Sequence, residues 1–138
     1  MSQDPQLKRF LLQEINTMAM LDHPNIVKLL KTFEEGDWYF LVMEYCDLGN
    51  LYACQSRQPG RVFALPEATS ICLQVLQGLD YVHQNGIIHR DIKLENIFLR
   101  KDSRGGYLCK IGDFGLARPI GDQESAITNC GTELYMAP

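Results

Sequence analysis

The stretch His-Arg-Asp-Ile-Lys-Leu-Glu-Asn at residues 89–96 decides how the rest of this chain is interpreted. A second motif, Asp-Phe-Gly at residues 113–115, begins 17 residues after Asn96. Either motif alone is weak evidence for a function, because single Asp and Asn residues are common in ordinary loops. Eight specified residues in this order match by chance at about 10⁻¹⁰ per window, taking about one in twenty per position. The two motifs therefore indicate one functional site.

The residues before the first motif predict a helix, a β-hairpin and a second helix. The first helix is expected to start at Asp4-Pro5, with Asp as N-cap, and to end at His23-Pro24, because the residue before proline leaves the α region. Alternating residues at 27–33 and dense β-formers at 38–43 favour the hairpin. Apolar side chains at helical spacing from residue 66 to residue 84 predict the second helix.

Loops and short strands complete the predicted organisation. Residues 47–50 and 55–60 contain Gly, Asn, Gln and Pro, which are typical of loops. The short apolar runs at 97–99 and 107–111, separated by a turn, favour a small hairpin. The fold class expected from this order of elements is α+β.

Glu14 lies on the apolar stripe of the first predicted helix, whose other members are Leu7, Leu11, Met18 and Leu21. A carboxylate on an apolar face either reaches water at the edge of the stripe or needs a cationic partner. The helix pattern alone leaves both readings open.

Composition restricts the functional class. The chain has 138 residues, 46% hydrophobic and 22% charged, which is typical of one globular domain or a piece of one. Its net charge of −4 argues against a nucleic-acid partner. The longest apolar run, Trp38 to Met43, is far shorter than the roughly 18 residues of a membrane-spanning helix, and the N-terminus does not resemble a signal peptide. The five cysteines form no C-x-x-C pair, so we expect reduced thiols and a cytoplasmic or nuclear location.

The two motifs resemble the catalytic loop and the magnesium-binding segment of eukaryotic protein kinases. The resemblance extends to Gly131-Thr132 and to Met-Ala-Pro at 136–138. Lys93 and Gly131-Thr132 are similar to the serine/threonine kinases, and residues 96–99 and 113–118 are faintly similar to the NIMA-related kinases. The implied fold is part of a two-lobe kinase: residues 1–43 from the end of the N-lobe, 44–50 as the hinge, and 51–138 from the first half of the C-lobe.

The resemblance assigns catalytic roles to five residues. Asp91 would accept the proton of a substrate Ser or Thr hydroxyl, and Lys93 would steady the γ-phosphate of ATP. Asn96 and Asp113 would hold Mg²⁺ through hard oxygen ligands, and Gly115 would allow Asp113 to swing.

The resemblance also implies a nucleotide pocket. Met43 would close the back of the adenine pocket, the backbone of Glu44 and Cys46 would pair with adenine, and Phe98 would lie under the ring. Glu14 would take the place of the helix glutamate that pairs with a lysine on a preceding strand. Residues 1–4 leave no room for that strand or for the Gly-rich loop, so we expect Glu14 to lack its lysine within this sequence.

Regulation and partners follow from the same resemblance. Arg90 and Arg118 are similar to the basic pocket that receives an activation-loop phosphate, with Thr128 as the first acceptor and Ser125 as the second. The expected partners are a protein substrate with a Ser or Thr acceptor and an upstream activating kinase. Two functions remain open at this point: a serine/threonine kinase, or a truncated kinase-like binding protein without turnover.

Overall fold

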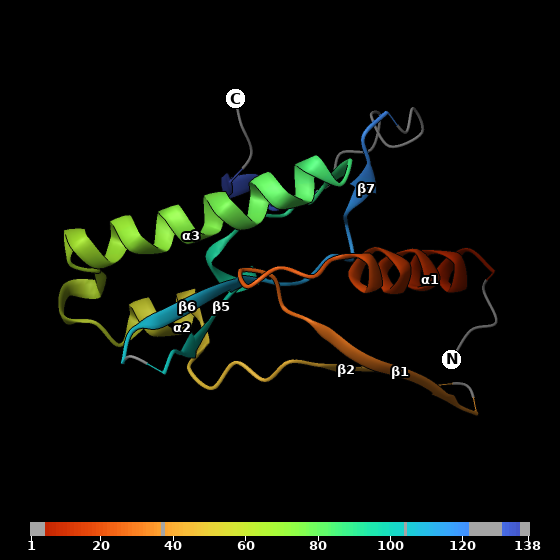
Figure 1. Ribbon diagram of the computed structural model, residues 1–138, viewed down its shortest axis with the longest axis horizontal. Helices are drawn as coiled ribbons and strands as arrows, with labels where there is room; N and C mark the ends of the chain where they lie inside the picture. The colour runs from red at the N-terminus through yellow and green to blue at the C-terminus, as the bar shows by residue number, and fades with distance from the viewer. Residues whose placement is uncertain (1–4, 37, 104, 122–130, 136–138) are drawn as a thin grey trace.

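The computed structural model describes residues 5–36, 38–103, 105–121 and 131–135. The first helix, α1 (Pro5–Met20), is followed by the antiparallel strands β1 (Leu29–Glu35) and β2 (Trp38–Met43). Figure 1 shows α1 beside this hairpin. The predicted α+β organisation and the predicted hairpin are therefore present.

The second half of the chain is built on a longer helix and short strands. The elements, in chain order, are β3 (Gly49–Asn50), α2 (Leu51–Ser56), the 3₁₀ turn η1 (Pro59–Arg61), α3 (Leu65–Gln84), β4 (Ile87–Ile88), η2 (Leu94–Asn96), β5 (Ile97–Lys101), β6 (Tyr107–Ile111), β7 (Arg118–Pro119) and η3 (Glu133–Tyr135). β3, β5 and β6 form one antiparallel sheet, and β4 pairs with β7. α3 packs along β6, on the opposite side of the sheet from the hairpin (Figure 1).

Four elements differ from the sequence-based expectations. α1 ends at Met20, before His23-Pro24, because the amide of Leu21 bonds to the carbonyl of Met18 in a tighter turn. β1 begins at Leu29 and not at residue 27, because the amide of Val27 bonds to the carbonyl of Ile111 at 2.9 Å. The predicted loop 47–50 contains β3, and the short helix α2 extends into the predicted loop 55–60. The N-cap of α2, Asn50, accepts a bond from the amide of Ala53 at 2.9 Å.

The core lies between α3 and the β5–β6 sheet. Val82, Ile111 and Phe114 have no exposed surface. Gly78 of α3 is needed for this packing, because a Cβ there would lie 2.9 Å from the carbonyl oxygen of Asn25. α3 therefore approaches the segment between α1 and β1 closely enough to hold it against β6. Among the described residues, neither long helix combines the length and hydropathy of a membrane span.

Candidate active site

Three side chains form a closed triangle of hydrogen bonds at the predicted catalytic loop. Nζ of Lys93 lies 2.8 Å from Oδ2 of Asp91 and donates to the hydroxyl oxygen of Thr132 at 2.9 Å. That hydroxyl donates to Oδ1 of Asp91 at 2.8 Å. Nδ2 of Asn96 also donates to Asp91, to Oδ2 at 3.0 Å and to the backbone carbonyl at 2.9 Å. Both carboxylate oxygens are therefore held in place.

This environment keeps the Asp91 carboxylate charged. Burial raises its pKa, but the hydrogen bonds from Lys93, Thr132 and Asn96 outweigh burial and leave the pKa below its usual value. The same carboxylate raises the pKa of the Lys93 ammonium. The site therefore presents an oriented carboxylate and a cation side by side, which can position a hydroxyl and an anionic group that reacts with it.

His89 connects this loop to the second motif. It is 1% exposed, and its Nδ1 accepts a hydrogen bond from the amide of Asp91 at 3.3 Å. Nε2 then carries the proton and donates to the carbonyl of Gly112 at 2.9 Å. The ring also meets Phe114 edge to face, with centroids 4.8 Å apart. Burial lowers the pKa of His89, which favours this neutral, structural form.

Backbone strain marks both motifs. Arg90 and Asp113 have φ values of 68° and 58°, in the left-handed region that residues other than glycine seldom adopt. Such strain persists where the surrounding structure imposes it, and it concentrates at functional sites. The bonds of the neighbouring His89 to the Asp91 amide and the Gly112 carbonyl supply that constraint.

The predicted metal ligands lie at one end of the β5–β6 ladder. Ile97 pairs with Ile111, and the amide of Gly112 bonds to the carbonyl of Asn96 at 2.9 Å. Asn96 and Asp113 therefore emerge from neighbouring strands at the same edge. Their amide and carboxylate oxygens fit the hard ligands that Mg²⁺ prefers. Within the described part of the chain, no three His, Cys, Asp or Glu side chains form a denser metal-binding group.

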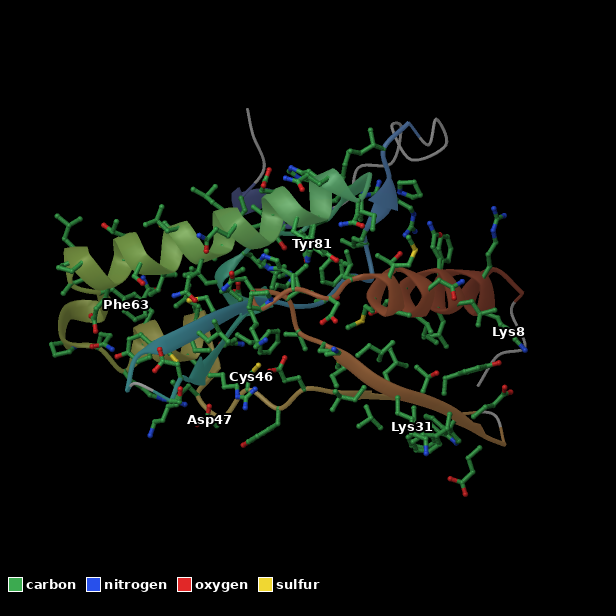
Figure 2. The ribbon with its side chains drawn as sticks, viewed as in Figure 1. Lys8, Lys31, Cys46, Asp47, Phe63 and Tyr81 are labelled. Atoms are coloured by element: carbon green, nitrogen blue, oxygen red, sulfur yellow. The ribbon has the colours of Figure 1, made fainter. Side chains whose placement is uncertain are left out.

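A cavity of about 430 Å³ lies next to this edge. Its lining includes six of the sequence-predicted site residues: Glu14, Met43, Glu44, Cys46, Phe98 and Asp113. Cys46 lies on the link between β2 and β3 (Figure 2). A Cβ at Gly112 would lie 2.8 Å from the ring of Phe98, so glycine is required where this ring forms the cavity wall. The volume and the apolar lining suit a small organic ligand.

Glu14 faces the second motif inside this cavity. Burial raises its pKa, and the negative charge of Asp113 raises it further. No lysine or arginine of the described residues forms an ion pair with Glu14.

The side chain of Glu44 has partners that the sequence did not suggest. Its Oε2 lies 2.8 Å from Nζ of Lys110, and its Oε1 lies 2.6 Å from Nη1 of Arg100. Burial raises the pKa of Glu44, but the bonds from the two cations outweigh burial and lower it overall. Lys110 also donates to the carbonyl of Pro24 at 2.8 Å. Arg100 and Lys110 therefore hold the side chain of Glu44 in place, next to the backbone that is expected to bind adenine.

The predicted regulatory residues are placed only in part. Nε of Arg90 donates to the carbonyl of Leu116 at 2.8 Å, and Arg118 pairs with Ile88 between β7 and β4. The guanidinium of Arg118 lies 5.1 Å from the centroid of the Phe10 ring. Arg90 therefore contacts the residue that directly follows the second motif, and Arg118 lies three positions after that motif. Thr128 and Ser125 lie outside the described residues.

Two residues of this site had no predicted role: Thr132, known from the sequence only as part of the Gly131-Thr132 resemblance, and Lys110. Thr132 lies 41 positions from the carboxylate it contacts, and no periodic pattern connects them. Lys110 is 4% exposed although its strand is short and flanked by a turn. For Lys110, the sequence contains one indication of burial: this lysine lies between Cys109 and Ile111, two residues of types that are commonly buried.

Known proteins share sequence similarity with almost the whole chain. Residues 1–138 match the protein kinase domain family. The serine/threonine-protein kinase Nek5 of Mus musculus is 42% identical over 126 residues, which are 91% of this chain and 20% of that protein. The serine/threonine-protein kinase ATG1a of Arabidopsis thaliana is 40% identical over 136 residues, 97% of this chain and 21% of that protein. The serine/threonine-protein kinase PLK4 of Drosophila grimshawi is 39% identical over 127 residues, which are 91% of this chain and 16% of that protein. The chain thus spans about a fifth of the length of the curated relatives that it matches.

Proposed function

This chain belongs to the protein kinase family, and we propose that it supplies the phosphoryl-transfer site of a serine/threonine protein kinase. The observation that carries the proposal is the triangle of Asp91, Lys93 and Thr132. A charged, oriented carboxylate beside an ammonium group is the arrangement that transfer from a nucleotide to a hydroxyl requires.

The proposed reaction transfers the γ-phosphoryl group of ATP to a protein Ser or Thr hydroxyl. The hydroxyl oxygen forms a bond to the γ-phosphorus as the bond to the β-phosphate oxygen breaks, and ADP leaves. Asp91 orients the hydroxyl and accepts its proton, while Lys93 lies where it can neutralise charge on the transferred group. Mg²⁺, when bound, would neutralise the phosphate oxygens.

The residues of the cavity would hold the nucleotide. Phe98 offers an apolar surface, and the link that contains Cys46 lines the same cavity and offers backbone groups. Asn96 and Asp113 would hold Mg²⁺ from the shared edge of β5 and β6. Thr132 would keep the Asp91 carboxylate in its reactive orientation.

A second function is supported by one observation. No cation of the described residues pairs with Glu14, which faces Asp113 across the cavity. In the kinase family the corresponding glutamate orients a lysine that grips the α- and β-phosphates. The alternative function is therefore that of a kinase-like protein that binds nucleotide without turnover.

Two measurements separate these functions. Mg-ATP should raise the thermal unfolding temperature, because a ligand at about 100 times its Kd adds about 2.7 kcal/mol of stability, and Asp113→Asn should abolish this gain. Transfer of labelled phosphate to a Ser/Thr peptide mixture should occur with the parent protein and not with Asp91→Asn. Stabilisation without transfer would favour the non-catalytic function, and the absence of both would contradict the proposal.

A further inference from the structure

A second cavity, of about 730 Å³, lies on the other side of the link between β2 and β3. We call it the rear cavity. Four cationic side chains line it, Lys28, Arg100, Lys101 and Lys110, against the three carboxylates of Asp22, Glu44 and Asp47. The whole chain carries a net charge of −4, so this lining is locally basic on an acidic protein.

Among the residues that line the rear cavity, two cations share one carboxylate. The single carboxylate of Glu44 faces both Lys110 and Arg100, at 2.8 and 2.6 Å. The Lys110 side chain is 5% exposed, but that of Arg100 is 50% exposed. Because one negative charge serves two cations, the exposed donors of Arg100 remain available to an anionic group from outside.

Lys101 adds a second cation at the same place. Its ammonium group forms no ion pair with any residue that the structure describes. Asp47, which also lines the rear cavity, accepts a hydrogen bond from the backbone amide of Lys101 at 3.0 Å. Figure 2 shows Asp47 on the link between β2 and β3. Arg100 and Lys101 therefore place two cationic residues at the end of β5, both among the residues that line the rear cavity.

The rear cavity also has exposed apolar surface. Leu30 and Tyr45 line it and are 59% and 81% exposed. A simple inorganic anion would leave this surface uncovered, whereas an apolar side chain next to acidic residues would cover it and pair with the cations. We propose that the rear cavity binds a short acidic segment of a partner protein, with carboxylates at Arg100 and Lys101 and an apolar side chain against Leu30 and Tyr45.

The rear cavity is distinct from the proposed nucleotide cavity but shares a wall with it. Glu44 and Tyr45 line both cavities. An acidic segment that binds Arg100 competes with Glu44 for that cation and so acts on the residue next to the nucleotide. Peptide and nucleotide should therefore bind at the same time, each with an effect on the affinity of the other.

The test uses a rhodamine-labelled peptide with the sequence Glu-Glu-Leu-Phe-Glu-Glu, blocked at both ends, and fluorescence anisotropy at low ionic strength. The expected result is saturable binding that weakens at least tenfold with Lys101→Glu and at least fivefold with Arg100→Gln. Lys31→Glu is the matched control, because Lys31 lies on the exposed hairpin away from Asp47 (Figure 2). It changes the net charge by the same amount and should weaken binding less than twofold.

Several results would overturn the proposal. They are the absence of saturable binding, equal losses with Lys101→Glu and Lys31→Glu, or equal affinity for the peptide in which Gln replaces every Glu. Release of the peptide by inorganic phosphate alone at millimolar concentration would show selection for charge only. Purely competitive displacement by Mg-ATP, in which the apparent Kd of the peptide rises without limit as Mg-ATP increases, would place the peptide in the nucleotide cavity; a change that levels off fits two sites. Because Asp113→Asn should leave peptide binding intact, failure of the kinase proposal and failure of this one give different results.

Discussion

The hydroxyl of Thr132 donates a hydrogen bond of 2.8 Å to the carboxylate of Asp91, which lies 41 positions earlier in the chain. The same hydroxyl accepts a bond from Lys93 at 2.9 Å. Thr132 therefore serves the two residues on which the proposed chemistry depends, and it joins the segment after the second motif to the first. A polar side chain with both donor and acceptor capacity is required at this position.

Replacement of Thr132 by valine should therefore reduce phosphoryl transfer. Valine keeps the shape but removes the donor to Asp91, so kcat is expected to fall about tenfold to a hundredfold with little change in KM for ATP. Loss of that hydrogen bond should also raise the pKa of Asp91, which carboxyl NMR measures without any need for activity. Thr132→Ser keeps the hydroxyl and should restore both values. An unchanged Asp91 pKa in the valine variant would contradict this role.

Glu14 should make the protein less stable as the pH rises. Its pKa is raised in the folded state by burial and by Asp113, so the unfolded chain loses this proton first, near pH 4.3. The stability linked to Glu14 is complete below that pH and falls as the pH rises toward the folded-state pKa. Glu14→Gln removes this loss, so its urea midpoint should exceed that of the parent by an amount that grows from pH 4.5 to pH 7.5.

The control for Glu14→Gln is the same change at an exposed carboxylate, Glu35→Gln on β1. Urea titrations at several pH values measure both variants against the parent. A difference that shrinks with rising pH would show that Glu14 is stabilised as a carboxylate, as it would be with a cation beside it.

Much of the site could be predicted because its signals are local. The residues of the 89–96 motif are neighbours in sequence, so the motif alone predicts that Asp91, Lys93 and Asn96 belong to one site. The long helix α3 was predictable for a similar reason, since apolar residues at helical spacing form one face without help from distant residues. The six predicted residues that line the 430 Å³ cavity then follow from the family resemblance.

The features that were missed depend on contacts between distant segments. Val27 has the alternation of a strand with Leu29, but its amide bonds to Ile111, so β1 starts later. Lys110 lies in a strand that is buried on both faces, and its partner Glu44 comes from a segment 66 positions away. A pattern within one window carries no information about such pairs.

Gly78→Ala should destabilise the fold. The new Cβ would lie 2.9 Å from both the carbonyl oxygen of Asn25 and Cδ1 of Ile111. A backbone carbonyl cannot move aside as easily as the end of a flexible side chain. Overpacking of this kind typically costs about 1–3 kcal/mol, more than alanine gains over glycine in a helix. Urea unfolding measures the loss. Gln77→Ala, at the exposed neighbouring position, should stay within about 0.5 kcal/mol of the parent, and an equally stable Gly78→Ala would show that α3 can move away.

Lys110→Met should be the most destabilising of the changes considered. It removes a cation from a nearly buried ion pair whose side chains are 5% and 14% exposed, and it leaves two carbonyl groups without their donor. Breaking such a pair costs about 3 kcal/mol, because the remaining charge is buried without that partner.

The matched control is Lys28→Met, which breaks a 3.0 Å pair with Asp22 whose side chains are 53% and 76% exposed. Exposed pairs contribute about 0–1 kcal/mol, so the control should unfold at nearly the parental urea concentration. Equal effects of the two substitutions would show that burial does not distinguish these pairs. A second variant, Glu44→Gln combined with Lys110→Met, should recover part of the loss, because the carboxylate that needs a cation is then gone.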